Sequence, residues 1–181
     1  GNRAGAPFFA VWLSSKVAAD IFMCAWANRH WIEDPAAFPA APPSLQALYA
    51  THLAMQRHPL AEALGGLAGY KVGAVGAEGE VCFSAPLFKG FLVEAPGSGL
   101  SAAAINMHQV EPEFAIVMAE SVRPRADGMP YTVEQVWEKV ESVVLSVGCC
   151  GRRATAEVLE TTTRLGRFND ALSSGGVVLG L

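Results

Sequence analysis

Apolar residues recur at helical spacing in two segments of the N-terminal third of the chain. Between residues 15 and 30 they stand three or four positions apart, which predicts an amphipathic helix with Ser14 or Ser15 as its N-cap. A proline-rich connector follows, and Ser44 is placed to cap a second helix. Residues 1–66 are therefore predicted to form an N-terminal helical segment.

From Leu67 onward the pattern changes, because glycines separate short apolar runs that are typical of strands. We predict a turn at Gly148–Gly151 and a helix capped by Thr132 that runs to about Val140. Residues 67–181 are predicted to form a β-rich domain, so the fold class is α+β, with helices leading into a rolled mixed sheet. Its predicted strands are Tyr70–Gly73, Val81–Phe83, Gly90–Val93, Glu113–Ala119, Ser142–Val147 and Ser173–Gly180.

The composition gives ample material for a core and little charge for the surface. Apolar residues make up 51% of the 181 residues and charged residues 17%. The net charge is -4 and the basic residues are scattered, so nucleic acid is not expected as a direct ligand. The low charge indicates either a surface that is buried against other subunits or simply an alanine-rich chain.

The cysteines and the start of the chain bear on the compartment. Four cysteines occur without a CxxC pair, which favours free thiols in a reducing compartment. The apolar run at residues 6–13 is too short to span a bilayer. The chain begins at Gly1 rather than Met, which allows a processed N-terminus or a removed targeting segment.

Glu111 and Glu113 are the first candidates for chemistry. One residue separates them in an extended segment, so both carboxylates are expected on one face of a strand. Two adjacent carboxylates suit a hard divalent cation such as Mg²⁺ or Mn²⁺, although an ordinary solvent-facing strand edge carries the same pattern. Lys71 lies in an apolar, glycine-flanked strand. It is either an edge lysine that reaches solvent or a buried cation near carboxylates.

The order of these motifs resembles the fumarylacetoacetate hydrolase superfamily and, more narrowly, its 2-keto-4-pentenoate hydratase branch. The motifs are a two-helix beginning, G-Y-K-V-G at residues 69–73, V-E-P-E-F-A-I-V at residues 110–117 and S-S-G-G-V-V-L-G at residues 173–180. The resemblance extends from about Ser14 to Leu181.

The resemblance implies a set of roles for residues of this chain. Glu111 and Glu113 match two of three acids that hold Mg²⁺ or Mn²⁺ in that branch, and Lys71 matches a lysine implicated in proton handling. Asp170 and Ser173 fall in a stretch that lies near the substrate pocket in the branch. The metal would polarise a small 2-keto or 2-hydroxy-dienoic acid.

Three departures from the branch point away from that chemistry. Val147 stands at the expected position of the third metal ligand, and Cys150 stands at the acid that follows it. Leu87 replaces an acid that moves protons in a P-D-F-G stretch. The branch continues well past the last strand seen here, so the sheet is expected to be incomplete at the C-terminus.

The favoured hypothesis is a catalytically degenerate hydratase-like protein that retains no cofactor. We expect it to serve as a structural or accessory subunit of a large complex, or as a homo-oligomer, in the mitochondrion or otherwise the cytoplasm. The alternative is an active Mg²⁺- or Mn²⁺-dependent hydratase or decarboxylase that uses Lys71, Glu111 and Glu113. A third hypothesis is a module that senses an organic acid.

Overall fold

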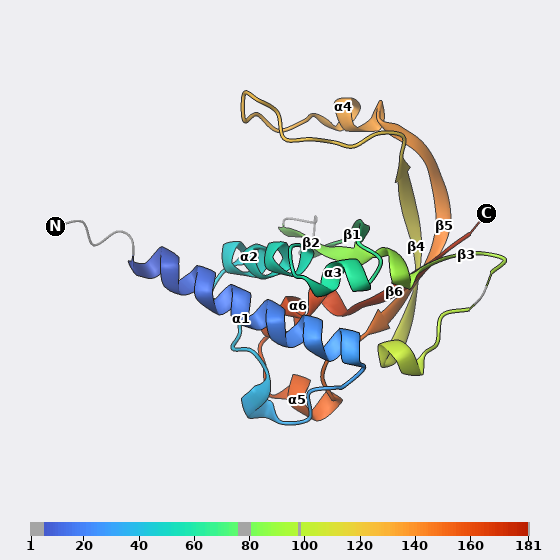
Figure 1. Ribbon diagram of the computed structural model, residues 1–181. Coiled ribbons are helices and arrows are strands. Elements are labelled where there is room, and N and C mark those ends of the chain that lie inside the picture. The colour runs from blue at the N-terminus through green and yellow to red at the C-terminus, as the bar shows by residue number, and fades with distance from the viewer. Residues whose placement is uncertain (1–5, 76–80, 98, 181) are drawn as a thin grey trace.

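The computed structural model describes residues 6–75, 81–97 and 99–180 (Figure 1). As predicted, Ser44 caps the second helix, where its Oγ accepts a hydrogen bond from Ala47 N at 3.2 Å. The first helix begins before the predicted Ser15. The helices of this part are α1 (Ala6–Asn28), α2 (Leu45–Gln56) and α3 (Leu60–Ala63), with a 3-10 turn at Pro35–Ala37.

The rest of the described chain is built on two sheets. Strands β1 (Leu67–Val75) and β2 (Val81–Phe88) form an antiparallel pair. The second sheet has the order β3-β6-β5-β4, in which β3 and β6 are parallel and the other neighbours are antiparallel. This mixed arrangement confirms the predicted α+β class. The strands of the second sheet are β3 (Leu92–Glu94), β4 (Met107–Met118), β5 (Val140–Gly151) and β6 (Ser174–Leu179).

Strands β4 and β5 are long and extend beyond the helical part of the molecule as a curved arm (Figure 1). The connection between them carries α4 (Val133–Trp137). Thr132 caps this helix, as predicted, in a capping box with Gln135. The helix is shorter than predicted, because Val140 already pairs with Met118 as the first residue of β5.

The segment Gly148–Gly151 is the end of β5, so the predicted turn is wrong. Cys149 pairs with Val110 on one side and Gly176 on the other. A Cβ atom on Gly151 would lie 2.2 Å from Ile105 O and 2.8 Å from Gly175 Cα. The glycine therefore permits a close approach of backbones rather than a change of direction.

One hydrophobic core joins the two predicted parts of the chain. Trp26 of α1 stacks on Phe91 at 4.9 Å between ring centroids, and it makes a T-shaped contact with Phe88 of β2 at 5.5 Å. The boundary between residues 66 and 67 stays a prediction of the sequence. No described helix is long and apolar enough to cross a membrane. The remaining helical elements are α5 (Ala156–Glu160), α6 (Arg164–Asn169) and 3-10 turns at Lys89–Phe91, Ala103–Ile105 and Ala171–Ser173.

Candidate functional site

Lys71 lies between the two glutamates that the sequence singled out. Its Nζ is 2.7 Å from Glu111 Oε2 and 3.2 Å from Glu113 Oε1. The same ammonium group lies 3.5 Å from Cys150 Sγ, and Gln109 Nε2 donates to Glu111 Oε1 at 3.1 Å. We call Lys71, Glu111, Glu113 and Cys150 the Lys71 cluster.

The pleat of two strands brings the acidic members together. Residues Glu111 and Glu113 are half-buried while the residues on either side of each are exposed, so the two carboxylates share one face of β4. On β5, Gly148 pairs with Glu111 of β4. A Cβ atom on Gly148 would lie 2.6 Å from Glu113 Cδ. The missing side chain at Gly148 therefore makes room for the Glu113 carboxylate. The predicted common face is confirmed.

The contacts within the cluster favour the charged forms of Lys71 and Glu111. Burial opposes the charge on Lys71, but the hydrogen bond to Glu111 and the charge of Glu113 raise its pKa well above the ordinary value. The hydrogen bond from Lys71 lowers the pKa of Glu111. Burial raises the pKa of Cys150 to about 11, so its thiol is neutral at physiological pH. One ammonium group thus faces two carboxylates, and no further anion comes from the thiol.

The residue that faces the glutamates on β5 is Ser146 rather than Val147. Ser146 pairs directly with Glu113, and directly opposed residues of an antiparallel pair share a face. Val147 pairs with Pro112, lies on the other face and is 40% exposed. Val147 therefore does not project towards Glu111 and Glu113, and its match to the third-ligand position of the branch stays a prediction of the sequence. The Ser146 hydroxyl is buried and has no hydrogen-bond partner in the described part of the chain.

Leu87 lies on the face of the small sheet that carries Lys71. It pairs with Gly69, two residues before Lys71 on β1, so the side chains at positions 71 and 87 project in the same direction. An apolar side chain at this place adds no group that exchanges protons.

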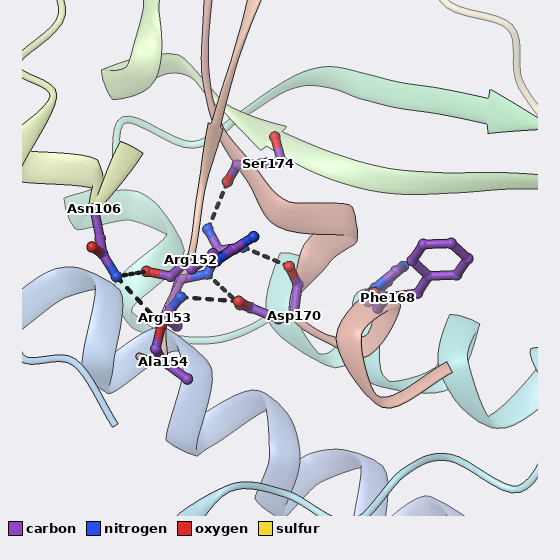
Figure 2. A network of polar contacts seen from close by, with 8 residues as sticks. Asn106, Arg152, Arg153, Ala154, Phe168, Asp170 and Ser174 are labelled. Atoms are coloured by element: carbon purple, nitrogen blue, oxygen red, sulfur yellow. Dashed lines mark hydrogen bonds and ion pairs between the residues drawn. The ribbon is translucent and has the colours of Figure 1, made fainter. Parts of the chain in front are cut away.

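Asp170 forms a buried ion pair with Arg153 (Figure 2). Both side chains are 1% exposed, and the guanidinium also donates to Ser174 O at 2.6 Å. The backbone N of Arg153 donates to Asp170 Oδ2 at 2.9 Å, and the guanidinium carbon lies 4.3 Å from the ring centroid of Trp26. Burial raises the pKa of Asp170, and the charge of Arg153 opposes that effect. These contacts give Asp170 a structural role.

Ser173 lies close to Asp170 in the chain but outside the Lys71 cluster. It is half-buried, has a left-handed backbone with φ of 55°, and its N donates to Asp170 O at 2.9 Å. In the described residues, no hydrogen bond joins Asp170 or Ser173 to the Lys71 cluster. Sequence reasoning missed Arg153, although a buried acid at position 170 would have required a cation.

None of the protein-family models or curated proteins compared with this sequence matches it. Solved structures do match, and they show that the chain shares the fold of the two structures described next.

Two of these structures are of 4-oxalocrotonate decarboxylase from Pseudomonas putida G7. The form complexed with magnesium and adipate has a TM-score of 0.69 and 18% identity, and the match covers 92% of this chain and 62% of that one. The form complexed with calcium and acetate has a TM-score of 0.66 and 18% identity, with 92% and 61% covered. This chain thus spans about three fifths of their length.

The residues of this site do not fit a divalent metal ion. Mg²⁺ prefers an octahedral set of oxygen ligands, usually with carboxylates among them. Here Glu111 and Glu113 supply two carboxylates, Ser146 supplies a neutral hydroxyl, and the Lys71 ammonium already lies between the acids. Within residues 6–75, 81–97 and 99–180, no group of three or more His, Cys, Asp or Glu is arranged to hold a metal.

Proposed function

We propose that this chain is a catalytically degenerate hydratase-like protein that serves as a structural subunit of a larger assembly. The observation that carries the proposal is the position of Lys71, whose ammonium group contacts both Glu111 and Glu113. An internal cation thereby takes the place between the carboxylates where a metal ion would be bound.

The charge of the cluster supports the loss of activity. Lys71 neutralises one of the two carboxylates, so the cluster keeps a net charge near that of one anion. A keto acid brings a carboxylate of its own and would be repelled, because nothing at Ser146 or Leu87 adds positive charge. A metal ion would supply Lewis-acid polarisation of such an acid, and an ammonium group does not replace that effect.

Metal content and turnover test the catalytic part of the proposal. We expect the purified chain to hold no stoichiometric Mg²⁺ or Mn²⁺ and to show no hydration or decarboxylation of a 2-hydroxy-dienoate or a 2-keto acid. Elemental analysis and an absorbance assay measure the two quantities. Stoichiometric metal together with turnover that Glu111→Ala abolishes would instead establish the active Mg²⁺- or Mn²⁺-dependent enzyme.

The assembly part of the proposal is supported by the outer face of the β4–β5 arm. Phe114 is 75% exposed and Leu145, its partner on β5, is 68% exposed. They belong to an apolar row on the face of the arm opposite to the Lys71 cluster, and no member of the row is charged. The members of the row are Val110, Pro112, Phe114, Ile116, Met118, Val143, Leu145 and Val147.

A second copy of this chain is the partner that the apolar row fits best. Two chains that each carry a net charge of -4 repel one another, so they associate most readily through a row of uncharged side chains. In a two-fold contact the same row meets itself, and burial of large apolar side chains supplies the association energy.

Light scattering on the purified chain measures this association. We expect a dimer or higher oligomer, and we expect Phe114→Asp or Leu145→Asp to raise the dissociation constant at least about tenfold, because a charge is buried at the contact. Val133→Asp is the matched control, since Val133 is 78% exposed but belongs to α4 and not to the row. A wild-type monomer would contradict self-association.

A further inference from the structure

The helix α4 on the β4–β5 arm presents an aromatic side chain beside two acidic ones. Trp137 is 59% exposed, although tryptophan is usually well buried. Glu134 lies three residues before it and Glu138 follows it as the C-cap, so the three side chains are neighbours on the helix surface. Both acids are exposed, and neither has an ion-pair partner in the part of the chain that the structure describes. We call Glu134, Trp137 and Glu138 the α4 face.

Polar contacts on both sides of α4 hold this face in place. Arg125 Nη2 lies 2.7 Å from Asp127 Oδ2, and its Nη1 donates to Gln135 Oε1 of the helix at 3.3 Å. After the helix, Lys139 forms an ion pair with Glu120. These contacts fix the helix, which lowers the entropic cost of binding a partner. They also occupy Arg125 and Lys139, so the unpaired charges of α4 and its cap are both negative.

A groove of opposite character lies between α1 and the C-terminal end of α2. Its volume is about 450 Å³, which is large enough for an organic group the size of an indole ring. Ala50, Leu53 and Ala54 of α2 give it an apolar lining. Lys16 of α1 and Arg57, the C-cap of α2, add positive charge. Arg57 is exposed and has no ion-pair partner among the described residues. We call this the basic groove.

The one acid among the described residues that line the groove is already paired. Asp20 Oδ1 lies 3.2 Å from His58 Nε2. The other ring nitrogen, His58 Nδ1, accepts a hydrogen bond from Leu60 N at 3.1 Å, so the ring proton is on the nitrogen that faces Asp20. The lining therefore keeps a net positive charge, which comes from Lys16 and Arg57.

The α4 face and the basic groove are complementary, but they lie apart in one chain. Figure 1 shows α4 on the arm, away from α1 and α2. An exposed indole ring is stabilised by apolar surroundings, and carboxylates beside it are stabilised by cations. The basic groove offers both. Because every chain carries both surfaces, a second copy supplies what each of them lacks.

We propose that the α4 face of one copy docks in the basic groove of a second copy. Trp137 contacts the apolar lining, and Glu134 and Glu138 lie near the two cations. Two copies can make this contact reciprocally about a two-fold axis. The inference rests on the proposed role as a subunit of a larger assembly, but it uses no residue of the apolar row. One short helix makes the contact, so it is weaker than the row contact and is measured at higher protein concentration.

Sedimentation equilibrium on the Phe114→Asp variant measures the contact without the apolar row. We expect this variant to associate at high concentration, and we expect Trp137→Ala within it to raise the dissociation constant at least about tenfold, as loss of a tryptophan anchor usually does. A monomeric Phe114→Asp variant, or a dissociation constant that Trp137→Ala leaves unchanged, would overturn the proposal. If the apolar row is mistaken instead, Phe114→Asp associates like the wild-type chain and the effect of Trp137→Ala remains.

Exchange of charges tests the pairing of the two surfaces, again with Phe114→Asp present. Glu138→Arg and Arg57→Glu should each weaken self-association at least about fivefold, because like charges then meet. An equal mixture of these two variants should associate about as tightly as the parent, since each α4 face meets a groove of opposite charge.

Two variants control for the change in net charge. Glu160→Arg and Arg167→Glu make the same changes of charge at exposed positions outside both surfaces. They should leave the association unchanged, and circular dichroism checks that every variant is folded. A mixture of Glu138→Arg and Arg57→Glu chains that associates no more tightly than either variant alone would refute the docking of α4 in the basic groove.

Discussion

Replacing Arg153 with methionine is expected to destabilise the protein by about 3–5 kcal/mol, the usual cost of removing one partner of a buried ion pair. The Asp170 carboxylate would stay buried while losing the guanidinium, and Ser174 O would lose a donor. The contact with the Trp26 ring would also be lost. Urea unfolding monitored by circular dichroism measures the change in the free energy of unfolding.

A neighbouring arginine provides the control. Arg152 is only half-buried, and it is its backbone oxygen, not its guanidinium, that takes part in the network of Figure 2. Arg152→Met should therefore cost less than about 1 kcal/mol. The double variant Arg153→Met with Asp170→Leu should recover much of the loss, because two apolar side chains leave no unpaired charge. An Arg153→Met variant as stable as Arg152→Met would contradict the structural role assigned to Asp170.

The double variant Lys71→Met with Ser146→Glu is expected to bind Mn²⁺ at least about a hundredfold more tightly than the wild-type chain. Lys71→Met removes the ammonium group from between the glutamates, and Ser146→Glu adds a third carboxylate beside Glu113. Three carboxylates repel one another until a cation binds, so added Mn²⁺ should also raise the melting temperature. Calorimetry and thermal unfolding give the two readouts.

Lys71→Met with Val147→Glu is a control of identical charge and residue composition. Its new carboxylate projects from the opposite face of β5, where Val147 pairs with Pro112. We expect this variant to gain no more affinity for Mn²⁺ than Lys71→Met alone. Equal affinity in the two double variants would show that the assignment of Ser146 as the third position is mistaken.

Local pattern predicted most elements of the fold because periodicity and capping are local properties. The Ser44 and Thr132 caps and the approximate positions of the strands were predictable in this way, although Gly90 and Phe91 of the predicted strand Gly90–Val93 lie in a 3-10 turn. The end of β5 was not, because the role of Gly151 depends on the backbones of Ile105 and Gly175, which lie far away in the sequence. A glycine pair looks the same in sequence whether it makes a turn or permits close packing.

The site was predictable only in part. Strand alternation alone places Glu111 and Glu113 on one face. Their contact with Lys71 joins β1 to β4, which are far apart in the sequence, so only the resemblance to a known fold could associate the three residues in advance. Motif alignment matched the third position to Val147, whereas the pleat of β5 directs that side chain away from the glutamates and places Ser146 opposite Glu113. The structural role of Asp170 depended on Arg153, which tertiary packing alone brings to it.

The two faces of the β4–β5 arm have a consequence for how this protein can change over generations. Because alternate residues serve opposite faces, insertion or deletion of one residue in β4 would exchange the glutamates with the apolar row. Substitutions have no such effect, and a substitution at position 146 would alter one face while leaving the other intact. The arm can therefore lose its chemistry one side chain at a time and keep its outer surface under separate selection.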